Sequence, residues 1–93
     1  MPNTNLLPVT VQAIHVAHVA ARAAAIGEKW NCPEGLNAKA VEAYTKGSLE
    51  IAVAYWRLAS ASSAGRTRAA RYNEFADRAA RDLDAKHREA VAA

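Results

Sequence analysis

The stretch LNAKAVEAYTKGSLEIAVAYWRLASAS, residues 36–62, decides the fold of this 93-residue chain. It contains no proline, and its apolar residues recur every three or four positions, which is the spacing of a helix face. The pattern therefore predicts one helix over 36–62, with Asn37 as its N-cap and with Gly47 letting a neighbouring backbone come close. The residues of this first face are Ala40, Tyr44, Gly47, Ile51, Ala54 and Leu58.

A second apolar face runs along the same segment. At 100° per residue it lies beside the first face and consists of Val41, Leu49, Ala52, Trp56 and Ala59. Other helices of the same chain could cover it, or it could pack against a second copy or another protein. Exposed apolar patches mark interaction sites, and a tryptophan is a frequent anchor in them. We interpret these five residues as a partner or dimer interface centred on Trp56.

Two further helices flank this segment. The first is predicted over residues 9–29, with Pro8 at its start and a break at 31–35. Its apolar stripe of Val9, Val16, Val19, Ala23, Ile26 and Trp30 is expected to be buried, and a second stripe comprises Val11, Ile14, Ala21 and Ala25. The other helix is predicted over 67–90, where Tyr72, Phe75, Ala76, Ala79 and Leu83 face inward. The expected fold is a single all-α domain, residues 1–93, forming a three-helix antiparallel bundle that dimerises, with residues 1–5 frayed.

Composition narrows the class of protein. The chain has one cysteine and a net charge of +3, so it is neither a disulfide-stapled secreted domain nor strongly basic. No apolar run is long enough to span a bilayer, and no Lys or Arg precedes the first apolar stretch as in a signal peptide. We expect a cytoplasmic protein, whose small core makes oligomerisation a plausible source of stability.

Candidate catalytic and metal-binding groups are sparse. His15 and His18 lie three residues apart, close enough to share a helix face, but no carboxylate or cysteine is near them in sequence. Cys32 has no neighbouring base to activate it. No glycine-rich phosphate loop or metal motif is present. The sequence predicts a protein that is not an enzyme and that uses no cofactor or metal, with both histidines half-exposed on a polar strip.

A basic stretch offers an alternative function. Between Glu50 and Glu74 every charged residue is an arginine, namely Arg57, Arg66, Arg68 and Arg71. Arginines near aromatic residues can hold phosphates and stack on bases, so nucleic-acid binding is one alternative. An ordinary solvated turn explains the same stretch. A structural subunit of a phage or secretion assembly is a further alternative.

The middle third of the chain resembles a known family. Gly27-Glu28-Lys29-Trp30, then Ala40-Val41-Glu42-Ala43-Tyr44, Gly47 and Tyr55-Trp56 are similar to the small bacterial QslA-type quorum-sensing antiactivators. The resemblance implies a helical homodimer that binds a transcription factor and blocks it. Together with the apolar faces, it predicts a small non-enzymatic regulatory or adaptor protein that occludes a partner protein.

Overall fold

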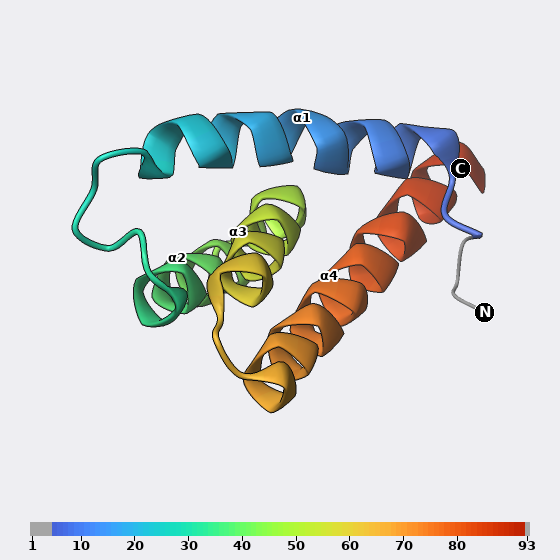
Figure 1. Cartoon of the computed structure of the whole chain (residues 1–93). Coiled ribbons are helices and arrows are strands. Elements are labelled where there is room, and N and C mark those ends of the chain that lie inside the picture. Colours follow the sequence, from blue (N-terminus) through green and yellow to red (C-terminus); the bar gives the residue numbers. More distant parts are fainter. Residues whose placement is uncertain (1–4, 93) are drawn as a thin grey trace.

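The computed structural model describes residues 5–92, and these residues form four α-helices (Figure 1). The helices are α1 (Pro8–Ala25), α2 (Pro33–Thr45), α3 (Leu49–Ser62) and α4 (Arg66–Ala92). The predicted all-α class is confirmed, whereas the predicted count of three helices is wrong. Of the segment expected to be frayed, residues 1–4 lie outside the described part of the chain. The backbone carbonyl of Asn5 accepts a 2.6 Å hydrogen bond from Arg88.

Gly47 is where the predicted helix over 36–62 divides into α2 and α3. Its φ of 87° lies in the left-handed region, which favours glycine. The N–H of Ser48 donates to the carbonyl of Ala43 at 2.9 Å, and the N–H of Gly47 donates to the carbonyl of Tyr44 at 3.1 Å. This pair of hydrogen bonds ends a helix. A Cβ at Gly47 would meet nothing within 4 Å, so the predicted close backbone approach is wrong.

The starts and ends of α1 and α2 follow local backbone chemistry. Pro8 lies in the first turn of α1, as predicted, and the helix ends at Ala25, two residues before Gly27 with its φ of 81°. In α2 the N-cap is Cys32, whose carbonyl accepts the N–H of Leu36 at 2.8 Å. The predicted N-cap at Asn37 is therefore wrong, because Pro33 starts the helix earlier.

The central element is α3, against which the three other helices pack. Its side toward α1 carries Ala54, which clusters with Ala17 and Ala21. Trp56 belongs to the larger core cluster, which also contains residues of α2 and α4. Two residues of a helix that are two positions apart point about 200° away from each other. Ala54 and Trp56 therefore place α1 and the α2–α4 side on opposite faces of α3.

The orientation of α1 reverses a prediction. Its buried residues are Thr10, Ala17, Ala21 and Ala25, while its four valines, Val9, Val11, Val16 and Val19, are at least half exposed. Of the stripe that was expected to be buried, Val9, Val16, Val19, Ala23 and Ile26 are therefore exposed, whereas Trp30 packs half-buried against the core. Of the second stripe, Ala21 and Ala25 are buried and Ile14 is half-buried. Small side chains let α1 approach α3 closely, and α1 lies along one edge of the molecule (Figure 1).

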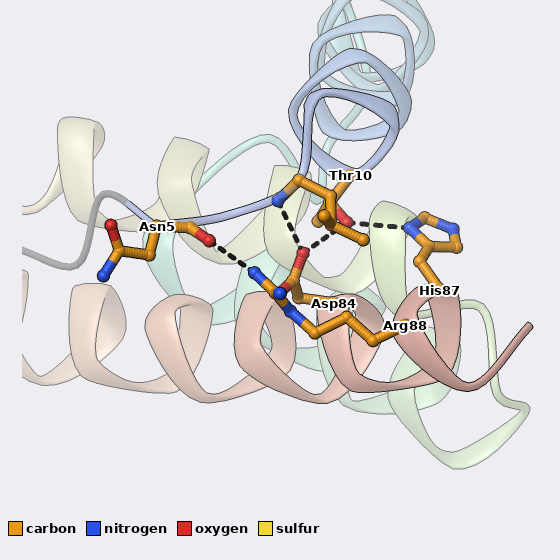
Figure 2. Close-up of polar contacts among 6 residues, drawn as sticks. Asn5, Thr10, Asp84, His87 and Arg88 are labelled. Atoms are coloured by element: carbon orange, nitrogen blue, oxygen red, sulfur yellow. Dashed lines mark hydrogen bonds and ion pairs between the residues drawn. The ribbon is translucent and has the colours of Figure 1, made fainter. Parts of the chain in front are cut away.

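A buried carboxylate fixes the start of α1 to α4 (Figure 2). Asp84, 6% exposed, accepts hydrogen bonds from the N–H of Leu7 at 2.8 Å, the hydroxyl of Thr10 at 2.7 Å and Nε of Arg88 at 2.6 Å. Nδ1 of His87 lies 2.8 Å from the same hydroxyl oxygen. The bonds from Leu7 and Thr10, assisted by Arg88, lower the pKa of Asp84 from 3.8 to about 2, although burial opposes the shift. A negative charge is also favourable at a helix N-terminus.

Within residues 5–92, no helix combines the length and the apolar character needed to cross a membrane.

Candidate functional site: an aromatic groove between α2 and α4

The five residues predicted to form one interface do not share an exposed face. Leu49, Ala52, Trp56 and Ala59 are buried within the chain, with exposed fractions of 7%, 0%, 6% and 0%. Val41, on α2, is 48% exposed. Because the chain turns at Gly47, α2 folds back along α3, and α4 covers the rest of the second apolar face. The chain therefore hides most of that face itself.

Trp56 is held from both sides. Its indole N–H donates a 2.7 Å hydrogen bond to Oδ1 of Asn37 on α2. Its ring centroid lies 5.7 Å from that of Tyr44 on α2 and 5.5 Å from that of Phe75 on α4. Tilted aromatic pairs at such distances add stabilisation beyond the burial of area. Trp56 is thus a core residue that joins three helices.

Above Trp56 the surface is hollowed between α2 and α4. The hollow encloses about 260 Å³ and is lined by Val41, Tyr44, Trp56, Phe75 and Arg78, which we call the α2–α4 groove. Its walls are half exposed, since Tyr44 is 36% and Phe75 37% accessible. Sites for whole small molecules usually enclose about 300–1,000 Å³. The groove therefore suits one large side chain better than a complete cofactor.

Polar bridges connect the two walls of the groove. The hydroxyl of Tyr44 donates to Oδ2 of Asp82 at 2.8 Å, and Nη1 of Arg68 donates to Oε2 of Glu34 at 2.8 Å. The residues nearer the starts of the two helices, Glu34 and Arg68, bond to each other, and so do the later residues Tyr44 and Asp82. The helices α2 and α4 therefore run parallel. The hydrogen bond to Asp82 and the negative charge of that carboxylate raise the pKa of Tyr44 above 10.0. Both bridges are exposed to solvent, so each adds little to the stability of the fold.

Arg78 is the charged residue of the groove. Among residues 5–92 it forms no ion pair, whereas Arg57, Arg68 and Arg88 each have a carboxylate partner. The sequence interpretation found Val41 and Trp56 but missed Tyr44, Phe75 and Arg78 as members of the site. The helix break at Gly47 was the signal that could have placed them, because it brings α2 alongside α4.

The basic stretch is partly neutralised in space. Arg57 contacts Asp77 at 2.8 Å and Asn73 at 3.0 Å, and Arg68 contacts Glu34. Arg66 and Arg71 are exposed on the first turns of α4. Arg57 and Arg68 thus lack acids nearby in sequence but have them in the fold. Two of them already have carboxylate partners, which weakens the patch as a site for phosphates.

The candidate metal and nucleophile residues form no metal-binding cluster in the described part of the chain. Along α1, His15 is exposed and His18 half-buried, and within residues 5–92 no three His, Cys, Asp or Glu side chains gather to hold a metal ion. His87 contacts Thr10 instead. Cys32 is a half-buried free thiol whose backbone caps α2.

Comparison of the chain with models of protein families, with curated proteins and with solved structures finds no match. The resemblance to QslA-type antiactivators stays a prediction from the sequence.

Proposed function

We propose that this chain is a small non-enzymatic regulatory or adaptor protein that binds a partner protein through the α2–α4 groove and occludes part of its surface. The observation that carries the proposal is an aromatic hollow at the surface whose floor is the buried ring of Trp56. Energetically dominant contacts between proteins are commonly single large side chains seated in such pockets. A transcription regulator, as the resemblance implies, is one partner of this kind.

The lining of the groove specifies the chemistry of the partner. Val41, Tyr44 and Phe75 offer apolar and aromatic surface, so the inserted group is a large apolar side chain such as Leu or Phe. Arg78 at the same site has no ion-pair partner among residues 5–92, and its positive charge favours a carboxylate next to that side chain. The preferred partner segment therefore combines one large apolar residue with an adjacent Asp or Glu.

The groove supports binding better than it supports proton transfer. Its one ionisable hydroxyl, that of Tyr44, already donates to Asp82, and its pKa is raised. Nucleic-acid binding is the weaker candidate because Arg57 and Arg68 are paired with carboxylates. A structural subunit of a larger assembly is the remaining alternative, and it predicts polymers that grow with protein concentration.

Selection of peptides from a random displayed library tests the proposal. The selected peptides should share a large apolar residue beside an acidic one, and they should lose binding to Val41→Glu, which places a charge on the wall of the groove. Arg78→Gln should weaken binding several-fold and reduce its salt dependence. The matched control is Val11→Glu, which changes the same residue type at a similar exposure of 52% on α1.

Two results would overturn the proposal. One is a peptide consensus without an apolar residue, or one whose binding is insensitive to Val41→Glu. The other is tight binding of a labelled DNA or RNA duplex that falls steeply as salt rises, which would favour the arginine stretch instead.

A further inference from the structure

The outer face of α1 carries a second apolar surface, separate from the groove. Val9, Gln12, Val16, Val19 and Ala23 of α1, and Ile26 at its C-cap, are all exposed. At 100° per residue they lie on the side opposite the buried residues of α1. The steps between them are three, four, three, four and three residues, which is the heptad spacing of a two-helix seam. The four large residues are 52%, 56%, 56% and 73% exposed in chain order. We call these six residues the α1 seam.

We propose that the α1 seam binds the α1 seam of a second copy of this chain in antiparallel orientation. In that register Val16 lies against Val19 of the second copy, and Val9 lies against its Ile26. The one polar member, Gln12, lies against the small Ala23. Every large apolar residue thus meets another, and the contact is identical for both copies, as a two-fold symmetric dimer requires.

Charge favours the antiparallel over the parallel orientation and does not oppose a second copy. Between Pro8 and Ala25 the chain has no acidic residue, and Arg22 is its single permanent charge. In the antiparallel register the two Arg22 residues are offset by nine positions, about 13 Å along the axis, which exceeds the screening length of roughly 8 Å at physiological salt. A parallel pair would instead align the two helix dipoles and place Gln12 against Gln12.

The area of the seam sets the strength of the dimer. From Val9 to Ile26 the seam is about 25 Å long at 1.5 Å per residue, so it covers a few hundred Å² on each copy. Stable complexes bury about 800 Å² on each partner. The dimer is therefore weak and its population depends on protein concentration.

Dimerisation through α1 leaves the proposed groove free. The α1 side and the Trp56 side of α3 point in opposite directions, as Ala54 and Trp56 show. A dimer would carry two grooves facing away from its two-fold axis. It would then bind a two-site partner more tightly than one copy does, with no change in either groove.

Sedimentation equilibrium between 1 and 500 µM tests the inference. The wild-type mass should rise from the monomer value of 9.9 kDa toward twice that value. Val16→Glu should keep the chain monomeric across the range, because it puts two like charges into the central layers. Val11→Glu, on α1 but outside the seam, and Val41→Glu, in the groove, should leave the association unchanged. Circular dichroism checks that each variant is folded.

Cysteine cross-linking tests the orientation. In a Cys32→Ser background, a mixture of Val9→Cys and Ile26→Cys chains should form a mixed disulfide, while Val9→Cys alone should not cross-link. A wild type that stays monomeric at 500 µM, or a dimer that survives Val16→Glu, overturns the inference. Self-cross-linking of Val9→Cys overturns the antiparallel register. If only Val41→Glu abolishes the dimer, self-association occurs through the groove, and the inference of an α1 dimer is likewise overturned.

Discussion

Truncating Trp56 should destabilise the folded chain itself. The side chain is 6% exposed and contacts Tyr44 and Phe75, so Trp56→Ala leaves a cavity joining three helices. Such truncations cost about 3–5 kcal/mol. A domain of 93 residues has a total stability of about 5–14 kcal/mol, so the variant should be marginally folded. Trp56→Phe keeps the ring volume in part but removes the donor to Asn37, which should cost about 1 kcal/mol for the hydrogen bond alone.

Urea unfolding followed by circular dichroism at 222 nm measures both effects. The free energies of unfolding should rank wild type, Trp56→Phe and Trp56→Ala in decreasing order, with similar dependence on urea concentration. A loss below about 1 kcal/mol for Trp56→Ala would refute the burial of this residue within a single chain. Trp56 would then belong to the exposed interface that was predicted from the sequence.

Three further variants, two at glycines and one at the buried Asp84, are tested by the same urea unfolding. Gly35→Ala should destabilise strongly, because its Cβ would collide with the backbone carbonyl of Trp30, which cannot move freely. Gly47→Ala meets open space but keeps a φ of 87°, so it should cost only about 1–2 kcal/mol, and an equal cost for both glycines would contradict this distinction. Asp84→Asn should lower the urea midpoint at neutral pH. Because the folded pKa of Asp84 is about 2 and its ordinary value is 3.8, the wild-type advantage should shrink as pH falls from about 4 toward 2. A constant difference between the two proteins over that range would contradict the role of the carboxylate.

The sequence predicted an all-helical chain but neither the number of helices nor the way they pack. The break at 31–35 and the turn near Gly65 were predicted from their Pro and Gly residues. Gly47 was predicted to lie inside one helix, whereas a glycine within a helical pattern can either be tolerated or end the helix. The decision rests on the carbonyls of Ala43 and Tyr44 being satisfied by a turn, and spacing does not reveal that.

Which face of a helix turns inward was also beyond the pattern. Both stripes of α1 are apolar, and the larger one was assigned to the core. In the fold the choice depends on Thr10, which reaches Asp84 across 74 positions of sequence, and on Ala17 and Ala21 fitting against α3. Only part of the groove could be predicted, for the same reason. The sequence pattern contains Val41 and Trp56, but Phe75 and Arg78 join them only through tertiary packing.

The hydroxyl shared by Asp84 and His87 has a consequence for the imidazole. Thr10 has a single hydroxyl hydrogen and gives it to the carboxylate, so the proton in the contact with His87 must come from Nδ1 of the ring. The neutral imidazole is therefore the Nδ1–H tautomer, which leaves Nε2 as the ring nitrogen that can accept a hydrogen bond from outside this contact.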